Sequence, residues 1–261
     1  MISPPSPILC TIGGFSIHYY GVFMFAAMIA AVKVITVISR KYYKDIDVET
    51  ILDVFPIVII FSIIGARMYY VLMDWAYYSH HLSEILALWN GGMSIHGGIL
   101  GGVISGICYT LIKKNNFLKY ADVFAYGLTI GQAIGRFGNY FNCEAFGKPC
   151  NIPFLKLYIP PEHRPLGFEE FSYFHPAFLY ETLWNLLVFF VLFFFVRKYA
   201  QNKPGIVFFS YLILYSTGRF FIEWCRLDSV KDIFGIPIAQ LVSLIAAAVG
   251  VIGVFFCAKK K

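Results

Sequence analysis

The stretch Gly127–Gly147 reads GLTIGQAIGRFGNYFNCEAFG, and it decides what kind of fold this chain adopts. Gly127, Gly131 and Gly135 recur at every fourth residue, so on a helix they form one smooth stripe. Small residues in such a stripe allow a neighbouring helix to approach closely inside a membrane. The stretch therefore predicts a membrane-spanning helix that packs tightly against a neighbour.

Polar side chains follow this stripe in an otherwise apolar segment. They are Arg136, Asn139, Asn142 and Glu144. A charge at the centre of a bilayer costs at least about 2.5–3.5 kcal/mol on insertion scales, so an intramembrane ion usually has a partner and a function. We therefore interpret this polar group as a candidate site.

The composition is that of a membrane protein. Of the 261 residues, 59% are hydrophobic and only 14% are charged, whereas soluble domains are about 25% charged. Seven apolar segments have membrane-spanning length. They are Ile17–Ile38, Ile51–Met73, Met93–Ile112, Ala121–Asn142, Pro176–Val196, Gly205–Glu223 and Pro237–Cys257. We expect an all-α polytopic membrane protein of about seven transmembrane helices, with residues 1–261 forming a single integral membrane domain.

Two further features of the spans bear on packing and access. Gly98, Gly102 and Gly106 form a second small-residue stripe, so the third and fourth spans are candidates for close packing. The longest connection, about residues 143–175, is rich in proline and aromatic residues. We expect it to form an ordered extracytoplasmic arm or lid rather than a linker.

Basic residues are unevenly divided between the two sides that seven spans define. Because cytoplasmic loops carry the excess of Lys and Arg, we expect the N-terminus outside and the C-terminus in the cytoplasm. The richer side has Arg40, Lys41, Lys44, Lys113, Lys114, Lys119, Arg197, Lys198, Lys203, Lys259, Lys260 and Lys261; the other side has Lys148, Lys156, Arg164, Arg226 and Lys231.

In this orientation several polar residues share one depth, in the outer half of the bilayer. They are Tyr20, Arg67, His96, Arg136, Tyr180, Glu181 and Arg219. Guanidinium groups keep their charge when buried and pair bidentately with phosphate, so three arginines at this depth predict a site for a phospholipid headgroup. The alternative is that each arginine pairs with a carboxylate, such as Glu144, Glu181 or Glu223, and joins two helices; Glu223 follows Arg219 by four residues and so lies on the same helical face.

His96 lies in the segment WNGGMSIHGG, with glycines on both sides. An imidazole is the usual proton acceptor near neutral pH, and flanking glycines leave room for a substrate. The alternative is a histidine that hydrogen-bonds a helix end.

Several patterns recur in order along nearly the whole chain. They are His18-Tyr19-Tyr20-Gly21, MSIHGG (93–98), GRFGNYFNCEAFG (135–147), His175-Pro176 with Leu179-Tyr180-Glu181, and Gly218-Arg219 through Glu223 and Arg226. Together they resemble the bacterial prolipoprotein diacylglyceryl transferases. The resemblance implies a seven-span inner-membrane enzyme that moves the diacylglyceryl group of phosphatidylglycerol onto the lipobox cysteine of a preprolipoprotein signal peptide. This reaction is the first step of lipoprotein maturation.

The resemblance also implies a set of site residues by motif position: Tyr20, His96, Arg136, Asn139, Glu144 and Arg219. We expect Tyr20, His96, Arg136 and Arg219 to be catalytic, and Arg136, Asn139, Glu144, Arg219 and Arg67 to bind phosphatidylglycerol. The nucleophile is the substrate's thiolate, and glycerol phosphate leaves with negative charge that arginines would stabilise. His96 is a candidate base, although an arginine-rich site alone could lower the pKa of the thiol.

Other readings predict different patterns. A lipid or anion transporter should carry polar groups across the membrane and show an internal repeat. A scaffold held by interhelical ion pairs should have equal numbers of carboxylates and arginines. Zinc bound by Cys143, Cys150, His163 and His175 is a minor alternative. We expect no cofactor, no metal and no nucleic-acid partner.

Overall fold

The structure is a computed structural model that describes residues 6–227 and 235–259. Lys231, Lys260 and Lys261, which belong to the charge pattern above, lie outside the described residues. The chain divides into two compact units. Unit 1 comprises Met1–Val37 and Ala121–Lys261, and unit 2 comprises Ile38–Tyr120. Each unit is described by itself.

Six helices among the described residues are long and apolar enough to cross a membrane. They are α1 (Tyr19–Tyr42), α2 (Val48–Met73), α4 (Ile95–Ile112), α6 with its continuation (Ala177–Tyr199), α8 (Ile206–Glu223) and α9 (Ile238–Lys259). The remaining expected span is helix α5 (Phe117–Phe141), which is less apolar because it carries several polar side chains. The prediction of a polytopic all-α membrane protein with about seven spans is confirmed, and most predicted ends fall within a few residues of the observed ones.

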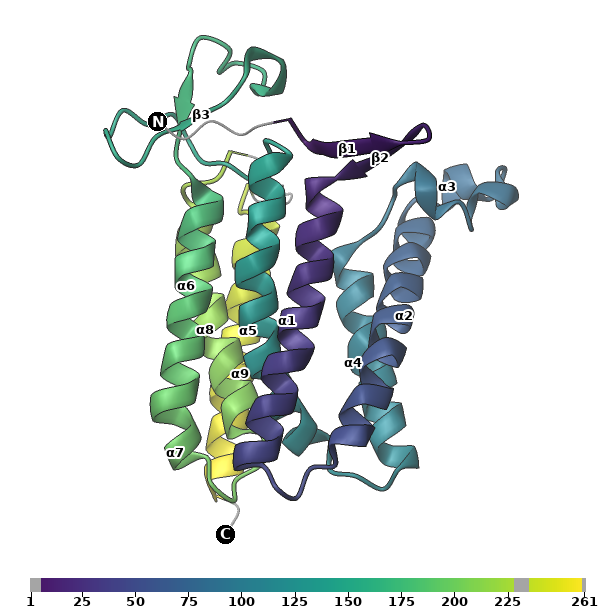
Figure 1. The fold of residues 1–261 in the computed structure, drawn as a ribbon, viewed down its shortest axis with the longest axis vertical. Helices are drawn as coiled ribbons and strands as arrows, with labels where there is room; N and C mark the ends of the chain where they lie inside the picture. Colours follow the sequence, from purple (N-terminus) through teal and green to yellow (C-terminus); the bar gives the residue numbers. More distant parts are fainter. Residues whose placement is uncertain (1–5, 228–234, 260–261) are drawn as a thin grey trace. The chain divides into compact units, whose positions relative to one another are not determined.

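In unit 1, α5 packs against α1 through the glycine stripe (Figure 1). A methyl group added to Gly127 would lie 3.2 Å from the carbonyl oxygen of Ala31, and one added to Gly131 would lie 3.7 Å from that of Ala27. The backbones can approach this closely because neither position carries a side chain. The close packing predicted for this stripe is therefore confirmed.

The other helices of unit 1 are α6, α8 and α9. Helix α6 (Ala177–Val191) continues through a π-helical segment, Leu192–Val196, into α7 (Arg197–Tyr199). Helix α8 has no cap from its own N-cap residue, Gly205. The buried Asp122 of α5 supplies one, because its carboxylate accepts hydrogen bonds of 2.7 Å from the backbone N–H groups of Gly205 and Phe208. This contact fixes α8 relative to α5.

A short hairpin precedes α1. Strand β1 (Ile8–Ile12) pairs antiparallel with β2 (Phe15–His18), and Ile8 lies opposite His18. The first predicted span began at Ile17, but Ile17 belongs to the exposed strand β2, so the helix begins at Tyr19. The alternation of residue types over so short a stretch was too weak to separate strand from helix.

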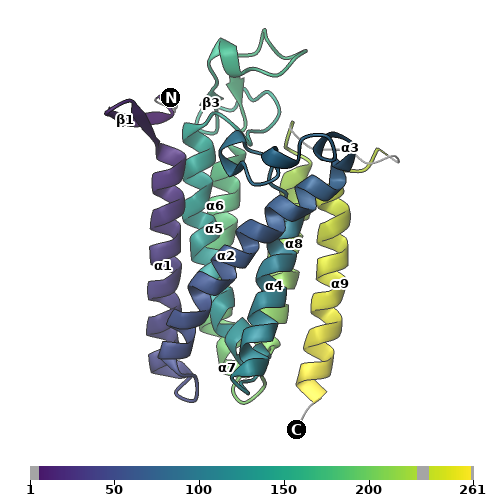
Figure 2. The same cartoon turned by 90° about the vertical axis from the view of Figure 1, so that its right-hand side faces the viewer.

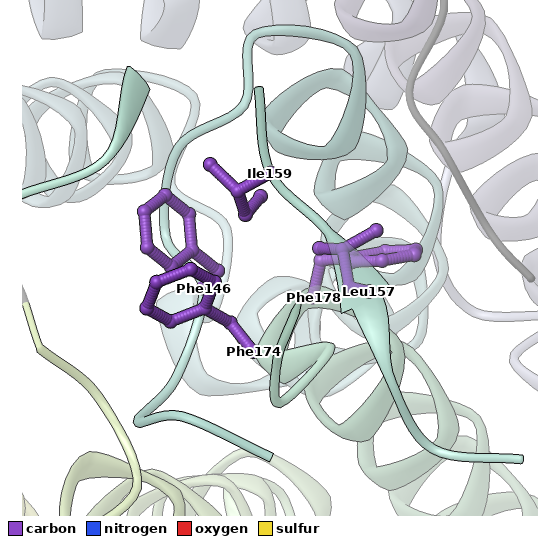
Figure 3. Packing of buried hydrophobic residues seen from close by; sticks show 5 residues of the cluster. All are labelled: Phe146, Leu157, Ile159, Phe174 and Phe178. Atoms are coloured by element: carbon purple, nitrogen blue, oxygen red, sulfur yellow. The ribbon is translucent and has the colours of Figure 1, made fainter. Parts of the chain in front are cut away.

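The connection 143–175 packs as an ordered arm. Strands β3 (Leu157–Tyr158) and β4 (Tyr173–Phe174) pair antiparallel, and a short 3-10 turn spans Pro161–His163. The arm has its own apolar core, shown in Figure 3, against which Phe137 and Tyr140 of α5 also pack. The core residues are Phe146, Leu157, Ile159, Phe174 and Phe178. Because Phe178 belongs to α6, this core anchors the arm to the ends of two helices.

Unit 2 is built on α2 and α4, which lie side by side (Figure 2). Asp47 caps α2 by accepting hydrogen bonds from the backbone of Glu49 and Thr50, each 3.1 Å long. The connection between the two helices contains α3 (Trp75–Tyr78) and two 3-10 turns, Leu82–Glu84 and Leu88–Asn90. The short helices fold this connection back over the end of the pair.

The closest approach of α4 is to α2. It involves Gly97 and Gly101, one residue before the predicted stripe of Gly98, Gly102 and Gly106. A methyl group on Gly65 of α2 would lie 3.1 Å from the Cα of Gly101. Gly98 and Gly102 of the predicted stripe also face α2, where a methyl group would meet Ser62, but the backbone contacts are made by a second glycine series shifted by one residue.

Candidate active site

Five ionised side chains meet at the arm end of unit 1, and we call them the arginine cluster. They are Arg136 from the last turns of α5, Glu181 from the first turns of α6, Arg219 and Glu223 from the end of α8, and Arg226 just beyond α8. The three helices converge here because α5 and α8 run toward the arm and α6 starts from it (Figure 1).

Glu181 is the centre of the cluster. Its Oε2 lies 2.5 Å from Nη2 of Arg136, and its Oε1 lies 3.2 Å from Nη1 of Arg219 and 2.9 Å from Nη1 of Arg226. The Glu181 side chain is only 4% exposed. One buried carboxylate therefore forms ion pairs with all three arginines and accepts hydrogen bonds from Arg219 and Arg226.

Glu223 is the second carboxylate. Its Oε2 lies 2.6 Å from Nη2 of Arg219, one helical turn earlier, and 3.8 Å from Nε of Arg226. Residues four apart on a helix lie on one face, so this pair follows directly from the sequence. Arg219 is thus held between two carboxylates on two helices.

A chain of polar contacts leads outward from the cluster. Nη1 of Arg136 donates to Oδ1 of Asn139 at 3.4 Å, and the Asn139 amide donates to Oε1 of Glu144 at 2.8 Å. Asn142 donates to the same oxygen at 3.4 Å. Glu144 is exposed, so its carboxylate keeps free acceptor capacity.

The two carboxylates of the cluster do not use every donor of its arginines. Among the described residues, the cluster contains three arginines and two glutamates. Within the described part of the chain, the Nε–H groups of Arg136 and Arg219 have no hydrogen-bond acceptor, and their side chains are 23% and 17% exposed. The carboxylate pairing considered as an alternative does occur among the described residues.

Tyr20 and two cavities lie in the same unit. The Tyr20 ring packs against Gly138, two residues after Arg136, and the side chain is 37% exposed.

A cavity of about 10 Å³, enough for one water, is lined by residues that include Glu181, Trp184 and Arg219. A second cavity of about 290 Å³ extends from Glu144 and is lined by Cys143, Glu144, Ala145, Phe146, His163, Pro165 and Leu227. Its volume is close to that of small-ligand sites.

His96 and Arg67 belong to unit 2. His96 is the second residue of α4 and is exposed, with its ring centroid 6.2 Å from that of Tyr69. Among the described residues its imidazole has no hydrogen-bond partner, so it does not cap a helix end there. Arg67 is buried and donates to backbone carbonyls instead of carboxylates. The roles expected for these two residues stay predictions.

Sequence reasoning did not assign a site role to Glu181 or Arg226. Glu181 was present in the Leu-Tyr-Glu motif at the expected depth, and Arg226 follows Glu223 by three residues. The signal that could have identified Glu181 was its expected depth, which is the same as that of the arginines on other spans. The sequence did not show that α5, α6 and α8 converge on this carboxylate.

The cysteines and candidate metal ligands of the arm complete the description. Burial raises the pKa of the Cys143 thiol and of the Cys225 thiol, so both are protonated at neutral pH. Thiols in that state are poor nucleophiles. Among residues 6–227 and 235–259, no three His, Cys, Asp or Glu side chains are grouped so that they could hold a metal ion.

Comparisons with known proteins identify the family. The family model for prolipoprotein diacylglyceryl transferase matches residues 7–256. A relative from Acaryochloris marina is 42% identical over 97% of this chain and 91% of its own length. One from Synechococcus elongatus is 42% identical over 95% and 86%, and one from Nostoc is 40% identical over 97% and 89%. All three are named phosphatidylglycerol–prolipoprotein diacylglyceryl transferase. The chain therefore belongs to the prolipoprotein diacylglyceryl transferase family.

Proposed function

We propose that this protein transfers the diacylglyceryl group of phosphatidylglycerol to the lipobox cysteine of a preprolipoprotein. The sulfur forms a thioether bond to the glycerol carbon, and the bond from that carbon to the phosphate oxygen breaks. Glycerol phosphate leaves with the electron pair, and the thiol proton is taken up by a base. The observation that carries this proposal is the arginine cluster, in which the Nε–H groups of Arg136 and Arg219 have no acceptor among the described residues, in a chain of this family.

The cluster suits a lipid phosphate. The phosphate of phosphatidylglycerol carries one negative charge, and guanidinium groups bind such an anion with charge-assisted hydrogen bonds. Arg136 and Arg219 each keep an Nε–H, so they can add hydrogen bonds to phosphate while Glu181 holds their terminal nitrogens. Because a second negative charge develops on the leaving phosphate, the same arginines would stabilise the transition state more than the ground state.

The polar chain that leaves the cluster suits the rest of the headgroup. Asn139 connects Arg136 to Glu144, and Glu144 is exposed beside the cavity of about 290 Å³. A carboxylate accepts hydrogen bonds from hydroxyls, and the headgroup glycerol offers two. We assign Asn139 and Glu144 to this glycerol, which would place the phosphate next to Arg136.

His96 and Tyr20 are assigned to the reacting atoms. An exposed imidazole with no hydrogen-bond partner among the described residues is available to take the thiol proton. The alternative, in which the arginines alone favour the thiolate, leaves His96 to orient the substrate. Tyr20, packed against Gly138 beside Arg136, would donate its hydroxyl to the phosphate.

We also propose that both units form one integral domain of a bacterial inner membrane, with the N-terminus outside and the site toward the outer leaflet. The distribution of basic residues supports this orientation. In unit 1, α7, which contains Arg197 and Lys198, lies at the end opposite to the arm (Figure 1). A reporter fused after Lys261 should read cytoplasmic, and one inserted between Asp74 and Gly92 should read extracytoplasmic. Finding both on one side would contradict the orientation.

The activity is tested directly with purified protein in detergent. Phosphatidylglycerol and a peptide that carries a lipobox cysteine are added, and the thioether product is followed by mass spectrometry. The expected result is a gain of one diacylglyceryl group on the cysteine with equimolar glycerol phosphate. A peptide in which alanine replaces the cysteine should remain unmodified. No product, from protein that unfolds cooperatively on heating, would overturn the proposal.

A further inference from the structure

Arg67 of α2 is the most completely hydrogen-bonded arginine in the described structure. Its Nε donates to the carbonyl oxygen of Ile85 at 2.8 Å, and Nη1 donates to those of Gly91 and Gly92 at 2.7 and 2.8 Å. Nη2 donates to Glu84 at 2.5 Å and to Ala87 at 3.5 Å. A guanidinium has five N–H donors, and here each meets a backbone carbonyl.

The environment of this guanidinium leaves no room for a phosphate. Arg67 is 4% exposed, and the Tyr78 ring lies 5.2 Å from its central carbon. Binding an anion would require it to give up these hydrogen bonds, four of which are partly buried and one, to Ala87, buried. A buried carbonyl that loses its partner costs about 1–3 kcal/mol. Its positive charge is instead stabilised by the dipoles of residues 84–92.

The two glycines of the WNGG segment are explained by this arginine. Gly91 and Gly92 have φ of 79° and 74°, which L-residues rarely adopt. These conformations turn two consecutive carbonyls toward Nη1 of Arg67. A methyl group on Gly92 would lie 2.6 Å from that nitrogen and 2.7 Å from Cε1 of Tyr70. The two glycines are therefore needed to place carbonyl acceptors around Arg67, and not only to leave space around His96.

The neighbours of Arg67 on α2 hold the next residues of the same segment. The carbonyl of Ala66 accepts a 3.0 Å hydrogen bond from the backbone N–H of Ser94, the N-cap of α4. A methyl group on Gly97 would lie 2.9 Å from the carbonyl carbon of Gly65. Three consecutive residues of α2 therefore contact the segment 91–97: Gly65 packs on Gly97, Ala66 bonds Ser94, and Arg67 bonds Gly91 and Gly92. His96 lies within this segment.

We propose that Arg67 is a positioning residue for His96. It binds the loop 84–92 to α2 and so sets where α4 begins and where the imidazole points. This inference rests on the proposed function, in which His96 acts in the transfer, and it gives Arg67 a role other than binding lipid phosphate. Lysine cannot replace Arg67, because three donors on a point charge cannot reach five carbonyls.

The test is a double-mutant cycle on turnover of phosphatidylglycerol and lipobox peptide. Arg67→Lys should lower kcat about 10- to 100-fold, as small misplacements of a reacting group do, while KM for phosphatidylglycerol stays within about twofold. In a His96→Gln background the same change should alter kcat by less than about twofold. An equal loss in both backgrounds, or a raised KM for the lipid, would overturn the proposal.

A second variant and a spectroscopic signal guard against simple misfolding. Gly92→Ala keeps the arginine but disturbs its partner, and should reproduce the kinetic effect of Arg67→Lys. Gly14→Ala is the matched control, because Gly14 has φ of 88° with open space around it. The ¹³Cε1 NMR signal of His96, assigned from His96→Gln, should shift in Arg67→Lys and Gly92→Ala but not in Gly14→Ala.

The NMR signal also separates this inference from the proposed function. If His96→Gln retains full turnover, the base role of His96 fails, and the signal alone decides whether Arg67 positions the imidazole. An unchanged His96 signal in both Arg67→Lys and Gly92→Ala would overturn the inference, whatever the activity.

Discussion

The arginines of the two units are held in opposite ways. In unit 1, the half-buried Arg136, Arg219 and Arg226 share two carboxylates. In unit 2, the buried Arg67 has five carbonyls and no carboxylate among the ion pairs of the described residues. Both arrangements pair the cation with acceptors, but only the first leaves Nε–H donors without an acceptor among the described residues.

This difference separates an arginine that can act on a ligand from one that holds a loop. Carboxylate pairing fixes the terminal nitrogens of Arg136 and Arg219 from one side, and their Nε–H groups remain available. The carbonyls around Arg67 accept from all five of its N–H groups, so no donor remains for a ligand. The predictions below follow from this contrast.

The largest expected effect is on stability, from Glu181→Gln. This change leaves three arginines facing one carboxylate, and removing one partner from buried ion pairs typically costs about 3–5 kcal/mol. Glu144→Gln is the matched control, because Glu144 is exposed and forms no ion pair with the three arginines among the described residues, so it should destabilise much less. Thermal unfolding in detergent measures both. Equal loss of stability in the two variants would mean that the ion pairs of Glu181 do not stabilise the fold.

The next effect is on turnover, from Arg136→Gln and Arg219→Gln. Each removes a group that would stabilise the leaving phosphate, and such losses are about 10²–10³-fold. Lysine keeps the charge but loses the planar fork, so Arg→Lys should fall between the parent and Arg→Gln. Turnover is expressed per folded molecule. If Arg→Lys is fully active and Arg→Gln only reduces the amount of folded protein, the arginines are structural.

His96→Gln should have a somewhat smaller effect, because the arginine cluster can itself favour the thiolate. General bases contribute about 10²–10⁴-fold, and we expect the lower end of this range. Binding of phosphatidylglycerol should be retained, since the phosphate is assigned to unit 1. Rates are measured at saturating lipid. Activity within a few-fold of the parent would reduce His96 to an orienting residue.

The smallest effect concerns an exposed ion pair in unit 2, between Lys119 and Asp45. Its hydrogen bond to Lys119 lowers the pKa of the Asp45 carboxyl below its ordinary value of 3.8. The stabilisation is therefore present above pH 3.8 and is lost as the pH falls through the lower, folded-state pKa. Exposed pairs contribute about 0–1 kcal/mol, so Asp45→Asn should change the melting temperature slightly at pH 7 and not at pH 2. A large loss at pH 7 would show that exposed pairs matter here as much as buried ones.

The helices could be predicted because their signals are local. Apolar length placed α2 and α8 to within three residues at each end, and the Gly127 stripe predicted the contact with α1. The family could be inferred from ordered motifs, and the comparisons confirm it.

The pairing of Arg219 with Glu223 could be predicted, because the two residues lie one turn apart on a helix, but the sharing of Glu181 by three arginines could not, because it depends on tertiary structure. Glu181 is distant in sequence from Arg136 and Arg219, and only the meeting of three helices brings it to both. The partners of Arg67 are backbone carbonyls, which every residue has, so the sequence does not single them out. The glycine pair Gly91-Gly92 therefore gave no indication that its carbonyls bind an arginine.

The most direct measurement of the central claim is the affinity for glycerol phosphate, the leaving group, of three variants that differ only in which arginine is changed. Binding is followed by ³¹P NMR with purified protein in detergent. Arg136→Gln and Arg219→Gln should each weaken binding by about tenfold or more, the loss of one charge-assisted hydrogen bond. Arg67→Gln should bind within about twofold of the parent, because its donors are already used. Weak binding by Arg67→Gln with normal binding by the other two would contradict the account.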